Sequence, residues 1–459
     1  NFTITVNKRT ETGTYEFVLS GESITPWEND PVSHDAVARE YVVVNVLEAG
    51  TLSQCIRASG KALDKVKNLK VTGVIDNMDF AVMRDSLENL QSLNLKEARI
   101  VAGKETYAHG VEWIPATVPD QIPIGAMTDK SSLLHLVLPD VVNFIGRRAF
   151  GGCQNLTGSL VIPEGVTELE DDAFNGCSSM AGSLYLPSTL KIIGESAFNS
   201  GGFSCELKFP ESVEVIGRYA FTNCRGLYGN LRLPSRLKEL GEGAFRDCTS
   251  MSGSLEIPQT LTKIPDYAFF FYYSFESNMH GTLKLHDGIT SIGKNAFCNT
   301  GLRGELVLPK DLVIISEGAF SGCDFSGSLV IPDNVAVIGE GAFAYNWRLM
   351  GTITIPQNVQ SIGANAFANC GSLEGLILED GVETIGRYAF NMCTGLGSIV
   401  CKSAVPPYLQ TGAFDGVPKD NFTLEVPESA IPTYATEPGW SDFKRISAYR
   451  NLVIRPSMA

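Results

Sequence analysis

The sequence predicts a repeat solenoid, in which short coils of chain stack and pair their strands in parallel. Ala-Phe recurs along the chain at intervals of 23 or 24 residues, apart from one interval of 28. A segment of the form Leu-x-Ile-Pro follows most of these pairs at a nearly constant distance. A unit of this size cannot bury its own apolar side chains, so neighbouring units must stack and bury them jointly. The repeat Phe stands at Phe150, Phe174, Phe198, Phe221, Phe245, Phe269, Phe297, Phe320, Phe343, Phe367, Phe390 and Phe414, and Met127 extends the series one step backward.

Each unit contains one very short predicted strand. In "AFGGCQNLTGSLVIPEGVTELEDDAF", Leu160 and Ile162 are two residues apart, so on a strand they face one side and Val161 faces the other. Pro163 has no N–H group and cannot continue a hydrogen-bonded ladder, so the strand ends there. Stacked coils would then pair strand on strand at roughly 4.8 Å per step.

The regions outside the repeats divide the chain further. Residues 1–46 contain the β-rich runs "FTITV", "TYEFVL" and "YVVVNV", which predict a small β module. Residues 47–125 predict an N-terminal capping region, with one helix after Thr51, a second in "DFAVMRDSLENL" and a strand in "LQSLNL". Residues 126–446 hold the repeats and a C-terminal cap in which Trp440 and Phe443 cover the last coil. Residues 447–459 are a tail or the start of a further segment.

Composition and charge exclude several classes of protein. With 44% hydrophobic and 19% charged residues, the 459-residue chain is globular rather than disordered. A net charge of −15 argues against nucleic-acid partners and anionic membranes, since both require a basic face. No run of 18 apolar residues is present, so no transmembrane segment is expected. The start, "NFTITVNKRTETG", has no charged-then-apolar leader, so we expect any export signal to have been removed or never to have existed.

The eleven cysteines do not predict a metal site or a disulfide framework. Seven of them occupy one slot, three residues after the repeat Phe: Cys153, Cys177, Cys224, Cys248, Cys323, Cys370 and Cys393. There is no Cys-x-x-Cys pair and no His at ligand spacing nearby. We therefore expect free thiols that act as small buried hydrophobes.

Catalytic motifs are also missing. "GITSIGKN" resembles a phosphate-binding loop, but it lacks the Ser or Thr that would hold magnesium, and its Ile-Gly belongs to the repeat. The five histidines form no metal-spaced pair, and there is no Gly-x-Ser-x-Gly motif. The sequence therefore predicts no enzyme, no catalytic residue, no cofactor and no metal.

Two stretches are candidates for partner binding. The outward residue of each Leu-x-Ile segment would form a row on a concave sheet, and the middle of this row is charged and aromatic: Tyr185, Lys208, Arg232, Glu256 and Lys284. The long 28-residue interval holds a run of aromatic residues, Phe270, Phe271, Tyr272, Tyr273 and Phe275. This aromatic run would either pack locally or form a partner or dimer contact, because five exposed rings are seldom seen on monomers.

The repeat unit "AFxxCxxLxGxLxIPxxVxxIGxxAF" resembles the BspA-like, or Treponema pallidum-type, leucine-rich repeats of Bacteroides surface proteins. The resemblance covers about residues 120–445, and it extends to the flanks "VKNLKVTGVIDNMDFAVMRDSLENLQSLNL" and "PGWSDFKRI". It implies a right-handed leucine-rich-repeat superhelix with short parallel strands on the concave face. It also implies a protein that is secreted or held at the cell surface, often by a lipid anchor on a removed N-terminal segment, and that adheres to host proteins such as extracellular matrix or to other cells.

Two functions are consistent with these features. The first is a non-catalytic recognition or adhesion protein that binds host or microbial proteins through the solenoid surface. The alternative is a glycan- or polymer-binding accessory protein, whose mark would be solvent-facing aromatic residues arranged as a sugar platform. The candidates for such a platform are Tyr272, Tyr273, Tyr345 and Trp347.

Overall fold

The computed structural model describes residues 3–6, 17–20, 39–104, 106–109, 112–272 and 278–449. The chain divides into two compact units, Asn1–Ala38 and Arg39–Ala459. In the first unit, β1 (Thr3–Val6) pairs antiparallel with β2 (Phe17–Ser20). The third strand of the predicted β module, β3 (Val42–Val46), differs from this expectation, because it pairs parallel with β4 (Asn68–Ile75) and is part of the second unit.

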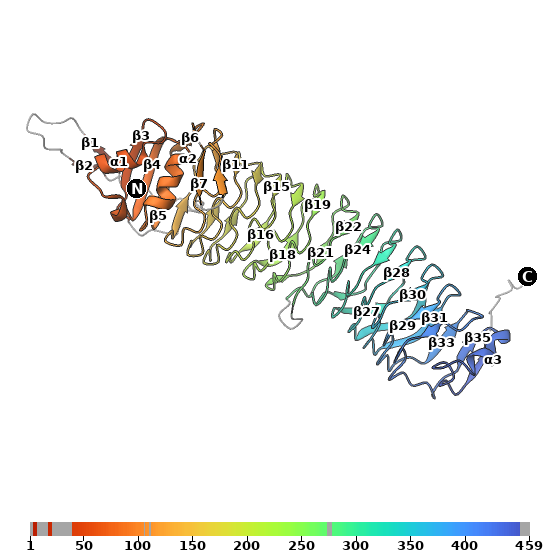
Figure 1. Ribbon diagram of the computed structural model, residues 1–459. Coiled ribbons are helices and arrows are strands. Elements are labelled where there is room, and N and C mark those ends of the chain that lie inside the picture. The colour runs from red at the N-terminus through yellow and green to blue at the C-terminus, as the bar shows by residue number, and fades with distance from the viewer. Residues whose placement is uncertain are drawn as a thin grey trace, which may run out of the picture. The chain divides into compact units, whose positions relative to one another are not determined.

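The second unit opens with a small parallel sheet and two short helices (Figure 1). The sheet joins β3 and β4 to β5 (Ser92–Asn94), β6 (Ala98–Ile100) and β10 (His135–Val137). The helical elements are α1 (Leu52–Ala58), η1 (Leu63–Lys65), α2 (Asn77–Ala81) and η2 (Val82–Ser86), and a hairpin of β7 (Tyr107–His109) and β8 (Glu112–Ile114) follows. Asp76 caps α2 by accepting hydrogen bonds from the N–H groups of Met78 and Asp79. Both predicted helices and the predicted strand are therefore present.

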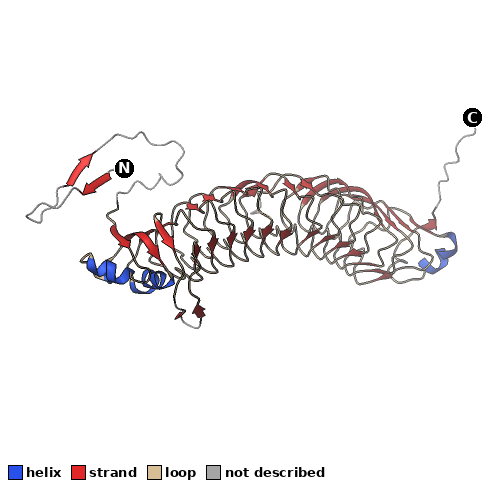
Figure 2. Cartoon of the chain, turned by 90° about the horizontal axis from the view of Figure 1, so that it is seen from above, coloured by secondary structure: helices blue, strands red, loops and turns tan. Residues whose placement is uncertain are grey.

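Beyond this region the chain forms a stack of coils with two rows of short parallel strands, one on each side (Figures 1 and 2). The first row lies at or just before the Leu-x-Ile-Pro segments. It contains β12 (Leu160–Val161), β14 (Leu184–Tyr185), β16 (Glu206–Lys208), β18 (Tyr228–Arg232), β20 (Met251–Ser252), β21 (Leu255–Glu256), β23 (Leu283–Lys284), β25 (Arg303–Gly304), β27 (Asp324–Ser328), β29 (Arg348–Ile355), β31 (Leu373–Leu378), β33 (Ser398–Cys401), β35 (Leu424–Val426) and β36 (Ile446–Ala448).

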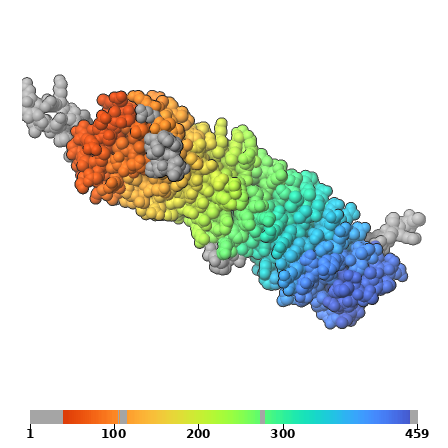
Figure 3. Space-filling view, in the orientation of Figure 1, coloured from red at the N-terminus to blue at the C-terminus, as the bar shows by residue number. Residues whose placement is uncertain are grey.

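The second row lies at the Ile-Gly segments and their variants. It contains β9 (Gln121–Ile122), β11 (Phe144–Ile145), β13 (Glu168–Leu169), β15 (Ile192–Ile193), β17 (Val215–Ile216), β19 (Glu239–Leu240), β22 (Lys263–Ile264), β24 (Ser291–Ile292), β26 (Ile314–Ile315), β28 (Val337–Ile338), β30 (Ser361–Ile362), β32 (Thr384–Ile385) and β34 (Tyr408–Leu409). Successive coils follow one another in chain order, so the colour changes steadily along this unit (Figure 3). The predicted parallel-strand solenoid is thus confirmed.

The two rows differ in how continuously their strands pair. Second-row strands pair in order from β9 to β19 and again from β22 to β34. First-row strands fall into the shorter groups β12–β14, β16–β18–β20 and β21–β23, and only from β25 to β36 does the pairing continue over many coils. Hydrogen bonds therefore join neighbouring coils more regularly on the second row than in the middle of the first.

A column of phenylalanine rings occupies the interior between the two rows. The twelve repeat Phe side chains are buried, and neighbouring rings stack with their centroids 5.1 to 5.8 Å apart. Backbone hydrogen bonds also join neighbouring coils beside the rings. For example, the Phe174 N–H donates to the Ala197 carbonyl oxygen at 2.8 Å. Each coil therefore offers its neighbour the same buried surface.

The last ring of this column is covered by the C-terminal cap. This cap contains η4 (Glu428–Ala430) and α3 (Ile431–Tyr434). Trp440 lies 5.6 Å and Phe443 5.8 Å from Phe414, ring centre to ring centre, and both are buried. The Trp440 indole N–H donates to the Pro407 carbonyl oxygen at 2.8 Å, so its polar atom is satisfied inside the cap. The expected cover of the last coil by Trp440 and Phe443 is present.

Glycine follows most of the second-row strands, at places where the neighbouring backbone lies too close for a side chain. A Cβ atom on Gly217 would stand 2.6 Å from the carbonyl carbon of Gly194, and one on Gly339 would stand 2.5 Å from the nitrogen of Glu317. Real Cβ atoms do not approach backbone this closely. Where Ile-Gly occurs, the close approach of the neighbouring coil accounts for it, and a phosphate-binding loop does not.

Candidate functional site

The five predicted residues of the outward row lie on consecutive coils and face solvent. Tyr185 is 41% exposed, and Lys208, Arg232, Glu256 and Lys284 are also exposed. Lys208 stands in register with Arg232, and Glu256 stands in register with Lys284. The structure therefore places these side chains at equivalent positions of consecutive coils, and two pairs of them are in register on paired first-row strands.

Charge in this row is partly balanced within the row. The Lys284 ammonium lies 2.6 Å from a carboxylate oxygen of Glu256, and the Lys208 ammonium lies 3.3 Å from one of Glu206. Both pairs are well exposed, so each contributes little to stability. Together with Tyr185 and Arg232, they give a surface with hydrogen-bond donors, acceptors and an aromatic ring, which suits a polar protein surface.

The aromatic insertion packs locally at its start. Phe271 is fully buried, so it belongs to the core and cannot touch a partner. Phe270 is half-buried beside Tyr267, with ring centroids 5.6 Å apart, and the Arg246 guanidinium lies 5.3 Å from its ring centre. Tyr272 is 60% exposed, while its backbone N–H donates to Asp247 at 2.8 Å. Tyr273 and Phe275 lie outside the described residues.

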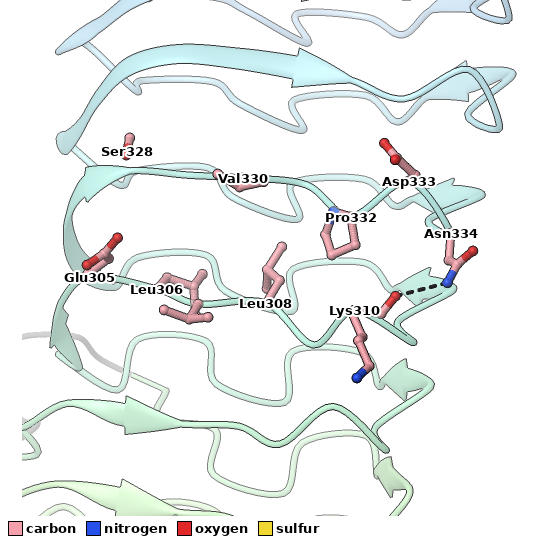
Figure 4. Close-up of a pocket in the computed structure, with 10 residues that line it drawn as sticks. Glu305, Leu306, Leu308, Lys310, Ser328, Val330, Pro332, Asp333 and Asn334 are labelled. Carbon is pink, nitrogen blue, oxygen red and sulfur yellow. Dashed lines mark hydrogen bonds between the residues drawn. The ribbon is translucent and has the colours of Figure 1, made fainter.

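A shallow groove opens at the first row of strands, next to β25 and β27 (Figure 4). It measures about 540 Å³ and lies between the segments 305–310 and 328–334. Its floor includes Val307 and Val330, which are 65% and 74% exposed. The strands of these two coils, β25 and β27, pair only at Arg303–Gly304, before the groove begins. Apolar side chains of the outward row thus remain accessible where the strand pairing between coils has ended.

The cysteine slot holds hydrogen-bond donors rather than reactive groups. All eleven cysteines are free, and those in the slot are buried. The Cys224 thiol donates to the carbonyl oxygen of Phe198 at 3.0 Å, and Cys323 donates to that of Phe297 at 3.1 Å. Burial raises the pKa of Cys224 and of Cys323 to about 12, which keeps the thiols protonated and unreactive. Where the slot holds Asn346 instead, its amide N–H donates to the Phe320 carbonyl oxygen at 2.8 Å.

A second outward row was not recognised from the sequence. It consists of the residues that precede the buried Ile or Leu of each second-row strand, and it includes the exposed Glu239, Lys263, Ile314, Val337 and Tyr408. The sequence does contain a signal for this row, because a more exposed residue directly precedes the buried Ile of the Ile-Gly segments, as Val337 precedes Ile338. Only one strand per coil was predicted, so this face was overlooked.

No group of three or more His, Cys, Asp or Glu side chains that could hold a metal occurs in the described ranges. Within those ranges, no helix combines the length and the apolar character needed to cross a membrane.

The geometry agrees with comparisons to known proteins. A family model described as a BspA type leucine rich repeat region (6 copies) matches residues 120–252, 204–326, 271–397 and 314–436. No curated protein matches the sequence. The chain is similar to the crystal structure of a leucine-rich repeat protein from Bacteroides ovatus, with 20% identity, a TM-score of 0.55, and coverage of 97% of this chain and 98% of that one.

A second similar structure is a leucine rich cell surface protein from Faecalibacterium prausnitzii, with 19% identity, a TM-score of 0.34, and coverage of 76% of this chain and 87% of that one. At 20% identity and a TM-score of 0.55, the likeness to the Bacteroides ovatus structure shows the fold alone. The family model is more informative, because its matches run from residue 120 to residue 436, well over half of the 459 residues. The chain therefore belongs to the BspA-type leucine-rich repeat family.

Proposed function

We propose that this chain is a non-catalytic recognition protein of the cell surface, which binds a protein partner through the outward row of its central coils. The observation that carries the proposal is the row itself. Five solvent-facing side chains, from Tyr185 to Lys284, differ from coil to coil, while the buried positions beneath them repeat. A surface whose outer positions vary over a constant core is suited to recognition of one partner.

The chemistry of the row favours a polar protein surface. Arg and Tyr are enriched among residues that dominate binding energy at protein interfaces. The mixed charges of Lys208, Glu256 and Lys284 would orient the partner and make association depend on salt. Host extracellular matrix proteins and the surfaces of other cells are the partners we infer.

Replacement of Tyr185, Lys208 and Arg232 together by Ser tests the proposal. We expect this variant to lose at least about tenfold in affinity, equal to about 1.4 kcal/mol, for the matrix or cell-surface protein that the unmodified chain binds best. Binding would be measured by biolayer interferometry against a panel of purified matrix proteins and intact cells, at low and physiological salt.

The matched control replaces Lys263 and Tyr408 by Ser, since both are exposed residues of the second row. This control should bind as the unmodified chain does. Unchanged binding of the triple variant to every ligand found would show that the central row is not the binding surface.

A further inference from the structure

Two aromatic side chains stand out from the surface near the C-terminal coils. Tyr345 is 51% exposed and Trp347 is 56% exposed. Their ring centres lie 6.1 Å apart, and the ring planes are inclined by 54°. The rings therefore lie side by side at an angle, rather than stacked face to face on each other.

The repeat does not require either ring. Tyr345 stands two residues after the repeat Phe and has a φ of 62°, in the left-handed region that glycine occupies most easily. The equivalent residue of the preceding coil is Gly322, with a φ of 66°. Trp347 stands four residues after the repeat Phe, where the next coil has Gly371. Each position is glycine in one neighbouring coil and a smaller polar residue in the other, Asn369 at the Tyr345 position and Asp324 at the Trp347 position, so the repeat does not call for a ring at either place.

The rings are accessible, and a charged pair is present on the same coil and the one before it. Asp324 occupies the position equivalent to Trp347 in the preceding coil, and its carboxylate lies 3.2 Å from the Arg348 guanidinium. These side chains are 41% and 64% exposed. Each can form further hydrogen bonds with a ligand, because a carboxylate has about four acceptor sites and a guanidinium has five donors.

This combination matches the surface of a sugar ring. A pyranose has an apolar face of C–H bonds that packs on an aromatic ring, and a rim of hydroxyl groups that exchange hydrogen bonds with carboxylate and guanidinium groups. Two adjacent rings can contact two successive sugars. Because the two planes are inclined, they suit a chain whose successive sugars are rotated relative to one another, rather than a flat chain.

We propose that Tyr345 and Trp347 form a binding site for a neutral, soluble glucan chain whose successive sugar rings are not coplanar. Neutrality follows from charge, since Asp324 and Arg348 balance each other and the chain carries a net charge of −15, which disfavours acidic polysaccharides. Tyr345 and Trp347 pack on two successive sugars, and Asp324 and Arg348 bind their hydroxyl groups. This site is separate from the central row that we propose for protein binding.

Affinity gel electrophoresis and titration calorimetry of the full chain test the proposal. The probes are an α-1,4-linked glucan (soluble amylopectin), a β-1,3-linked glucan (laminarin) and, as the flat-chain comparison, cellulose in a pull-down. We expect at least one soluble glucan to retard the chain and cellulose not to retain it. Tyr345→Ala and Trp347→Ala should each weaken binding about tenfold, or about 1.4 kcal/mol, and the double variant should show no retardation.

The control variant is Tyr228→Ala, which removes a ring of similar exposure, 52%, from a distant coil. It should retain glucan binding, and thermal unfolding should show that all variants remain folded. The proposal is overturned if no soluble glucan binds, or if the Tyr345 and Trp347 variants bind as well as the control. It is also overturned if these variants lose a protein ligand while no glucan is retained, since the rings would then belong to a protein interface.

Discussion

The central coils and the C-terminal coils share one interior but differ in the first row of strands. Between Leu184 and Lys284, the first-row strands are mostly two or three residues long and their pairing is interrupted. From β29 onward, strands of up to eight residues pair without a break to β36. The phenylalanine column runs unchanged beneath both regions, with ring separations of 5.5 Å at Phe221 and Phe245 and 5.3 Å at Phe367 and Phe390.

This difference shows that the repeat fixes the buried contacts but not the outer surface. Ala-Phe supplies the ring stacking that recurs from Phe150 to Phe414, and in most coils Gly after the second-row strand allows the close backbone approach. The first-row pairing can be interrupted locally, because the column and the second row still hold the coils together. Outward residues such as Arg232 and Val330 can therefore change without loss of the stack.

The largest effect is expected from breaking the column in each region. Phe221→Ala and Phe367→Ala should each lower the free energy of unfolding by about 3–5 kcal/mol, because both rings are fully buried and stacked on both sides. Urea unfolding followed by circular dichroism would measure both, with the half-buried Phe270→Ala as the control of smaller cost. A loss below about 1 kcal/mol in either region would contradict a shared column.

Replacement of Gly by Ala where neighbouring coils lie close together should lower the free energy of unfolding by somewhat less than the loss of a ring. Gly217→Ala in the central coils and Gly339→Ala farther along should each destabilise the chain by about 1–3 kcal/mol, since each new Cβ meets backbone atoms. Gly371→Ala serves as control, because its Cβ would meet no atom closer than 3.5 Å. Equal stability of all three variants, measured by the urea midpoint, would contradict the close approach.

Alkaline pH should destabilise both regions through their buried thiols. Burial raises the pKa of Cys224 and Cys393 to about 12 in the folded chain, whereas an exposed thiol has an ordinary value of 9.0. Above pH 9 these thiols ionise in the unfolded chain but stay protonated in the folded chain. Their contribution to the free energy of unfolding is therefore fully present below pH 9 and is lost as the pH rises toward 12. Between pH 9 and 10 the loss should be about 1 kcal/mol per buried thiol.

Unfolding at a series of pH values would measure this slope. Cys224→Ser, which can still donate a hydrogen bond to the Phe198 carbonyl oxygen, should make the slope shallower. A stability that stayed constant, or rose, from pH 9 to 11 would mean that the thiols are not buried as described.

The smallest effects are expected on the outer face, and there the regions should differ. Val330→Ser, at an exposed position past the end of β27, should change the free energy of unfolding by less than about 0.5 kcal/mol. Ile377→Ser, inside the paired strand β31, should cost about 1 kcal/mol because a β-branched residue leaves a half-buried strand position. Thermal unfolding of both variants compares the two sites, and a larger loss at Val330 would reverse the comparison.

The sequence predicted the features that repeat, and it missed those that depend on how neighbouring coils fit together. The period of the Ala-Phe pairs predicted the column and the stack, and Trp440 and Phe443 were recognised as its cover. The second strand of each coil was missed because it is only two residues long, as at Ile314–Ile315, and alternation over so few positions is a weak signal.

The sequence of a single repeat unit also does not determine where the strand pairing ends or how Phe271 packs. The pairing of β25 with β27 extends only over Arg303 and Gly304, which the residues of one coil do not reveal. Phe271 was a candidate for partner contact, yet it packs in the core because the enlarged loop folds its first residues inward. The proposed sites at Tyr185–Lys284 and at Tyr345 and Trp347 consist of outward residues, which the repeat does not constrain.

Hydrogen exchange measured along the whole chain by mass spectrometry tests the central claim most directly. If the phenylalanine column holds the coils together beneath both rows of strands, second-row amides should be protected from exchange in the central and in the C-terminal coils, as at Ile193 and Ile362. First-row amides should be protected in β31 but exchange faster at 306–308 and 329–331. Equal protection along both rows, or exposed second-row amides in either region, would contradict it.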